Sequence, residues 1–69
     1  MTLGKLLLTC RGRLSREEVA AAVGVAAVSI WRWENDKDLP RLQHLARFLR
    51  AVDAAPEHRL MAWNLVDGS

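Results

Sequence analysis

Apolar residues recur along most of this chain at the spacing of three and four positions that one face of an α-helix requires. The first such set is Leu3, Leu6, Leu7 and Cys10. It predicts a helix over about residues 2–11, for which Thr2 is a suitable N-terminal cap and Gly12 a suitable end. No sustained alternation of apolar and polar residues, the sign of a half-buried strand, interrupts the helical spacing. We therefore expect an all-α domain.

The second predicted helix has the clearest start signal in the chain. Ser15 and Glu18 form a capping box, in which each side chain can satisfy the backbone amide of the other residue. Gly24 ends this helix, because glycine adopts the left-handed backbone of a helix end without a steric cost. A third helix begins almost at once, with Ile30 and Trp33 as its core positions. Two short helices joined through a glycine turn are typical of a helix-turn-helix motif.

The last third of the chain predicts two more helices. A fourth helix has the most regular apolar stripe, formed by Leu42, Leu45, Ala46, Leu49 and Val52, with Phe48 beside it. Pro56 suits the first position of a fifth helix over about residues 56–66, because proline lacks the amide that a first turn leaves unpaired.

The apolar residues of the fifth helix point in too many directions to face one small core. They are Leu60, Met61, Trp63, Leu65 and Val66. A short helix of this kind is not stable without packing, and the surplus apolar surface is explained if two copies bury the same patch. We therefore predict a homodimer through Leu60, Met61, Trp63 and Leu65, with Phe48 contributing from the fourth helix.

Length and charge narrow the picture further. The 69 residues fit one domain over 1–69, and the single cysteine, Cys10, excludes an intramolecular disulfide and is expected in the core. Nine of the ten basic residues precede position 51, a distribution that suits a surface that binds a polyanion. The chain shows no secretory signal and no apolar run of membrane-spanning length, so we expect a cytoplasmic protein without a membrane partner.

Catalysis has little support in the sequence. His44 and His58 lack metal-ligand spacing with Cys10 or with a carboxylate pair, and Ser15 is already used as a cap. No glycine-rich loop suited to a phosphate is present, and a five-helix domain of this size offers little room for a pocket. We expect no enzyme activity, no metal, no cofactor and no small-molecule ligand.

Residues 14–35 resemble the helix-turn-helix domains of phage repressors and Cro-like proteins, also called the xenobiotic-response-element family. The resemblance rests on Leu14-Ser15-x-Glu17-Glu18-Val19-Ala20-x-x-Val23-Gly24-Val25, followed by Ser29-Ile30-x-Arg32-Trp33-Glu34-Asn35. It implies a lambda-repressor-like domain with the helix-turn-helix at about residues 15–34. It also implies a dimeric, sequence-specific regulator of transcription, such as a Cro-like repressor or a controller protein. Such a dimer places two third helices in the major groove of double-stranded DNA, about 34 Å apart on an inverted repeat.

The resemblance also implies residue roles. The residues expected to face the groove are Ala26, Ala27, Val28, Ser29, Trp31 and Arg32. Arg16 and Arg41 match positions from which family members contact phosphates. We expect the basic residues Arg11, Arg13 and Lys37 to contact phosphates as well. Ala26 departs from the family pattern, because a capping Ser or Thr is usual at that position. The family also pairs Glu34 with a basic residue of the first helix, and that partner can be Lys5, Arg11 or Arg13.

The groove-facing set is unusually apolar for a helix that reads bases. Alanine and valine side chains can pack on the 5-methyl group of thymine, and Arg32 is the only side chain on this helix able to donate two parallel hydrogen bonds to guanine. Trp31 is expected to be exposed, as a DNA contact, as an anchor for a protein partner, or as a surface residue with no binding role. An alternative function is therefore a helix-turn-helix scaffold that acts mainly through protein contacts, as an antitoxin or accessory subunit. An excisionase-like or MerR-like module fits less well, because a helical stripe, and not a β-wing, follows Pro40.

Overall fold

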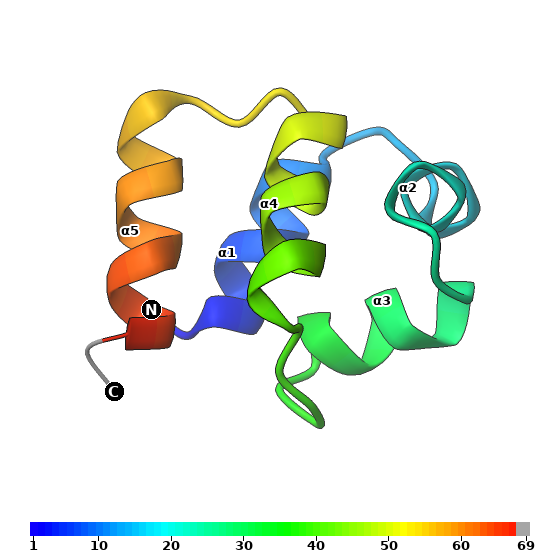
Figure 1. Ribbon diagram of the computed structural model, residues 1–69, viewed down its shortest axis with the longest axis horizontal. Coiled ribbons are helices and arrows are strands. Elements are labelled where there is room, and N and C mark those ends of the chain that lie inside the picture. Colours follow the sequence, from blue (N-terminus) through cyan, green and yellow to red (C-terminus); the bar gives the residue numbers. More distant parts are fainter. Residues whose placement is uncertain (68–69) are drawn as a thin grey trace.

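Residues 1–67 of the chain, which are the residues described by this computed structural model, form five α-helices and no strand. The helices are α1 (Leu3–Arg11), α2 (Arg16–Val23), α3 (Ala27–Glu34), α4 (Leu42–Ala51) and α5 (Pro56–Asp67). Figure 1 shows α2 and α3 at one end of the long axis and α5 at the other, with α1 and α4 between them. The prediction of an all-α domain is confirmed. No helix of the described part is long and apolar enough to cross a membrane.

The residues predicted to cap the helices occupy the predicted helix ends. The Thr2 hydroxyl accepts a hydrogen bond from a first-turn amide of α1, at 3.2 Å. At α2 the Ser15 hydroxyl accepts from the Glu18 amide at 3.0 Å, and Glu18 Oε1 accepts from the Ser15 amide at 3.3 Å. Gly24 ends α2 in the left-handed region, with φ of 90°. Ala26 leaves the beginning of α3 without a side-chain cap, as its residue type predicts.

All five helices contribute to one apolar core. The largest fully buried side chains are Phe48, Leu6, Leu7, Ile30, Leu45, Val19 and Val23. Trp33 is 4% exposed, which confirms its predicted place in the core. Cys10 packs at the edge of this cluster and is half-buried, and burial raises the pKa of its thiol.

The inner face of α4 differs from the predicted stripe. Leu45, Phe48 and Leu49 are buried, whereas Leu42 is 60% exposed and Ala46 is also exposed. The physical reason is that burying a phenyl ring removes far more apolar surface from water than burying an alanine methyl group, so the helix turns Phe48 inward. Because Phe48 is fully buried, its predicted part in a dimer contact is wrong.

The beginning of α1 lies directly against the end of α3. The Gly4 amide donates to Asp36 Oδ1 at 3.0 Å, and Asp36 adopts a positive φ of 55° to meet it. A Cβ atom on Gly4 would lie 2.5 Å from the carbonyl oxygen of Glu34 and 2.7 Å from that of Trp33. Only glycine therefore permits this approach, which sets α3 in position against α1.

Candidate nucleic-acid interface

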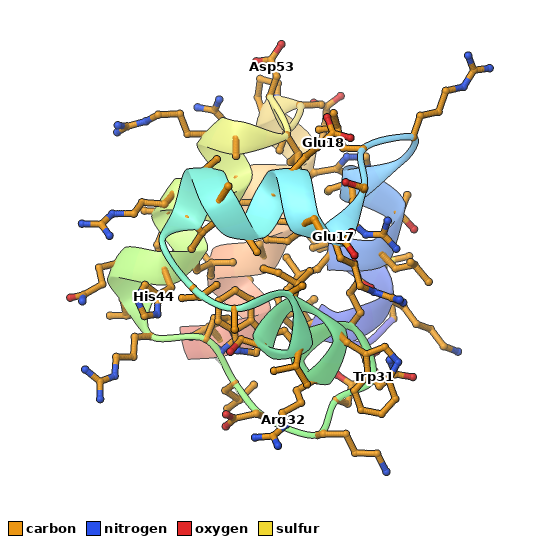
Figure 2. All side chains as sticks on the ribbon, turned by 90° about the vertical axis from the view of Figure 1, so that its right-hand side faces the viewer. Glu17, Glu18, Trp31, Arg32, His44 and Asp53 are labelled. Atoms are coloured by element: carbon orange, nitrogen blue, oxygen red, sulfur yellow. The ribbon has the colours of Figure 1, made fainter. Side chains whose placement is uncertain are left out.

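The outward face of α3 carries the residues that were predicted to face a DNA groove. Ala26, Val28, Trp31 and Arg32 are exposed, with Val28 at 54% and Trp31 at 41%, and the remaining two, Ala27 and Ser29, are half-buried. Figure 2 shows Trp31 and Arg32 on the side of α3 that faces away from α2. The six residues therefore lie at the beginning of α3 and along its exposed side. The exposure expected of Trp31 is confirmed.

The inward face of α3 holds a buried charge between its apolar side chains. Ile30 and Trp33 are buried beside Glu34, whose side chain is only 1% exposed. Its carboxylate accepts from Arg11 Nε at 2.5 Å and Nη2 at 3.3 Å, and from Arg16 Nε at 2.8 Å. A buried carboxylate is tolerated only when it is paired and hydrogen-bonded, and here two guanidinium groups surround it. This cluster joins α1, the beginning of α2 and the end of α3.

Two arginines therefore hold Glu34, one of them among the expected partners and one not. The sequence left Lys5, Arg11 and Arg13 open, and the structure selects Arg11. It adds Arg16, which the sequence analysis missed as a partner. A partial signal existed, because the spacing of Ile30, Trp33 and Glu34 places the carboxylate on the inner face of α3, where a buried charge requires a paired cation.

The two arginines differ in what they leave free. Arg11 also donates from Nη1 to the Leu14 carbonyl oxygen at 2.8 Å, and its side chain is 14% exposed. Arg16 uses only Nε, and its side chain is 37% exposed. Within the described residues, the two terminal nitrogens of Arg16 make no hydrogen bond. Arg16 is thus held by Glu34 and still has donors for an external anion, whereas every nitrogen of Arg11 is engaged inside the protein.

The remaining residues predicted to contact phosphates lie in the segments that link the helices. Arg13 lies between α1 and α2, Lys37 follows α3, and Arg41 immediately precedes α4. All three are exposed, and their side chains form no hydrogen bond or ion pair with any residue of the described range 1–67. The nearby carboxylates are partly occupied, since Asp36 accepts from Gly4 and Asp38 accepts from the Leu39 amide at 2.9 Å.

A cleft of about 380 Å³ separates the outer side of α3 from the beginning of α4. Ser29, Arg41 and His44 are among its lining residues. The His44 ring stacks on Trp33, with ring centroids 6.0 Å apart and an interplanar angle of 26°. This stack fixes the first turn of α4 beside α3, so the backbone that carries Arg41 has a defined position next to the candidate interface.

No group of three or more His, Cys, Asp or Glu side chains able to hold a metal ion occurs in the part of the chain that is described.

A second apolar surface lies on α5, at the other end of the molecule (Figure 1). Leu60 is 64% exposed and Met61 is 41% exposed, and with Leu65 they line a groove of about 430 Å³. Glu57 and Asn64 complete its lining. The other residue predicted for a dimer contact, Trp63, is half-buried and packs against the core. Of the four predicted contact residues, Leu60 and Met61 are therefore the most exposed.

Comparison with known proteins adds one finding. A family model described as a helix-turn-helix domain matches residues 2–61, a range that begins before α1 and ends within α5. No curated protein and no solved structure matches the chain significantly. The matched range includes α2, the turn at Gly24 and α3 in full, together with the cluster around Glu34.

Proposed function

The chain belongs to the helix-turn-helix domain family, and we propose that it is a sequence-specific regulator of transcription that binds double-stranded DNA. Domains of this kind are in general DNA-binding and not enzymatic. The observation that carries the proposal is the outward face of α3, which is exposed, supported from within by Glu34 and its two arginines, and flanked by Arg16, Arg32 and Arg41, which have free donors. Such a regulator acts where the chromosome is, which for a phage or bacterial protein is the cytoplasm.

In this proposal α3 lies in the major groove, with base contacts from its outer face. Arg32 is exposed and can donate two hydrogen bonds to guanine O6 and N7, which is the commonest specific contact to a base. Ser29 donates to a base edge or to a phosphate from the cleft beside α4. Ala26, Ala27, Val28 and Trp31 supply the apolar part of the same surface.

Phosphate contacts position the domain on the duplex without reading its sequence. Arg16, at the first position of α2, is the strongest candidate, because Glu34 orients it while its terminal nitrogens stay free. Arg13, Lys37 and Arg41 are free to contact neighbouring phosphates. Arg11 was predicted as a fifth phosphate contact, but each of its three nitrogens already donates inside the protein and its side chain is only 14% exposed, so we assign it the role of holding Glu34.

We further propose that the protein is a homodimer of the Cro-like or controller type that represses transcription from an inverted repeat. The support is the groove on α5, where Leu60 and Met61 are exposed beside Leu65, with the half-buried Trp63 nearby. Two copies that bury this patch against each other form a two-fold contact, and a two-fold dimer matches a palindromic site.

A scaffold that acts through protein contacts, as an antitoxin or accessory subunit, is the second candidate. Exposed Val28 and Trp31 favour it, because a large aromatic side chain on the surface is a common anchor of a protein interface. The unpaired basic side chains around α3 favour DNA instead.

Selection of duplexes from a randomised library by the purified full chain tests the proposal. We expect enrichment of a short inverted repeat, with binding that weakens as salt concentration rises. Arg41→Ala should reduce the yield of bound duplex. Arg50→Ala is the matched control, because it removes an exposed arginine from the other end of the same helix. Absence of any enriched sequence would contradict the proposal and favour the scaffold.

A further inference from the structure

The outward face of α3 offers very few hydrogen-bonding groups. Its polar capacity consists of Ser29, which is half-buried, Arg32 in the last turn, and the single indole N–H of Trp31. Between them lie the exposed side chains of Ala26 and Val28. A surface of this composition cannot read a base pair mainly through hydrogen bonds, as amide and guanidinium side chains do.

Apolar side chains pressed against a polar base edge would carry a cost. The donors and acceptors of the base would lose water without gaining a partner, and unpaired polar groups are expensive to bury. The major-groove edge of a pyrimidine has one apolar group, the methyl on C5 of thymine. Contact with that methyl buries apolar surface on both sides and leaves the neighbouring hydrogen-bonding groups accessible.

We propose that Val28 and Trp31 form a site for the 5-methyl group of a pyrimidine in the major groove, an inference that rests on the DNA-binding function proposed above. The two residues are three positions apart, so their side chains are neighbours on the helix surface. Both are exposed, at 54% and 41%, although α3 has a complete apolar inner face of its own. Arg32 directly follows Trp31, Arg16 is hydrogen-bonded to Glu34 of the same helix, and Arg41 lines a cleft with Ser29. These cations give α3 the charge complementarity that a DNA groove requires.

The supporting structure holds this pair in a fixed place. Ile30, Trp33 and Glu34 anchor the opposite face of α3, and Gly4 abuts its C-terminal end. Because the backbone of α3 is anchored in this way, the helix cannot move closer to the base to restore the contact when the methyl group is absent, so the pair can distinguish a methyl group from a hydrogen atom.

The same methyl group occurs in thymine and in 5-methylcytosine, so the test separates the two sources. A selected duplex is prepared with thymine, and again with deoxyuridine at each thymine in turn, which removes only the methyl. A second pair carries cytosine or 5-methylcytosine at each cytosine of the site. Binding of the full chain to each duplex is measured by fluorescence anisotropy at constant salt.

We expect binding to weaken about fourfold for each contacted methyl group removed. A difference between thymine and deoxyuridine identifies thymine as the ligand, and a difference confined to the cytosine pair identifies methylated cytosine. In Val28→Ala the difference should nearly disappear. This variant is expected to fold, because residue 28 is exposed and alanine favours helix. Leu8→Ala, which shortens an exposed leucine on α1, should retain the difference in full.

Two other outcomes would overturn the inference, and they are distinguishable. Equal binding of methylated and unmethylated duplexes in both pairs would refute the methyl site and leave the DNA-binding function intact. Failure of the folded chain to bind or select any duplex would refute the proposed function and the methyl site with it.

Discussion

The molecule has two exposed apolar surfaces, and they differ in what surrounds them. On α3, Val28 and Trp31 lie near basic side chains that have no partner within the described residues. On α5, Leu60 and Met61 line a groove whose polar residues are Glu57 and Asn64. Similar apolar exposure therefore comes with different polar neighbours, the free guanidinium of Arg32 on α3 and a carboxylate and an amide on α5. We interpret the first surface as one for a polyanion and the second as one for another protein chain.

The two helices also differ in what holds them. The inner face of α3 is anchored by Ile30, Trp33 and the carboxylate of Glu34, which two arginines clamp. By contrast, α5 has one fully buried residue, Ala62, and packs mainly on α1. A helix that reads bases must keep its geometry when it binds, whereas a helix in a dimer contact can rely on its partner for part of its stability.

The largest effect is expected from removing the buried carboxylate. Glu34→Ala should lower the free energy of unfolding by about 3–5 kcal/mol, because it leaves the buried part of two guanidinium groups unpaired. Urea unfolding followed by circular dichroism measures this loss. The matched control is Glu17→Ala, which removes an exposed glutamate from the first turn of α2 and should cost no more than about 1 kcal/mol. A Glu34→Ala protein as stable as the control would show that the cluster does not support α3.

Gly4→Ala tests the contact that sets α3 against α1. We expect a loss of about 2 kcal/mol in unfolding free energy, because the new methyl would meet backbone oxygens that have little freedom to move. The higher helix propensity of alanine offsets less than about 1 kcal/mol of this loss in unfolding free energy. Leu8→Ala, a truncation of an exposed residue of the same helix, should change stability far less. A stabilised Gly4→Ala protein would mean that α1 and α3 can separate without cost.

Features of the fold that depend on residues close together in the sequence could be predicted, whereas features that depend on packing between helices could not. The capping box at Ser15 and the turn at Gly24 depend on neighbouring residues, and both were predicted correctly. The rotation of α4 was not, because Phe48 and Ala46 flank the same stripe and only packing against the other helices selects the larger side chain. Arg16 was missed as a partner of Glu34 because the two residues lie on different helices and meet only when α2 packs against α3.

A charge on the α5 surface should separate assembly from DNA contact. Leu60→Glu is expected to shift the protein toward monomer in analytical ultracentrifugation, because two buried carboxylates would face each other across a two-fold contact. Affinity for an inverted repeat should fall by about tenfold or more, with little change for a single half-site. Leu8→Glu, on an exposed position of α1, serves as the control. Unmodified protein that is monomeric at high micromolar concentration would contradict a dimer.

The smallest effects are expected from the phosphate contacts around α3. Arg41→Ala should weaken binding to every duplex to a similar degree. Arg16→Ala should do the same and should also lower stability, because it takes away one of the two partners of the buried Glu34. Each should also lower the slope of log affinity against log salt by about 1. Titrations at several salt concentrations measure this. A loss confined to one base position, with an unchanged salt slope, would show that the arginine reads a base instead.

The central claim is that the outer face of α3 is the DNA-binding surface and that α5 is not. The most direct test is a titration of the ¹⁵N-labelled full chain with a selected duplex, followed by amide chemical shifts. We predict the largest shifts at residues 26–32 and at Arg16 and Arg41, with only small shifts from residue 57 to residue 66. Shifts that are largest on α5, or absent from α3 while the duplex is bound, would contradict the claim.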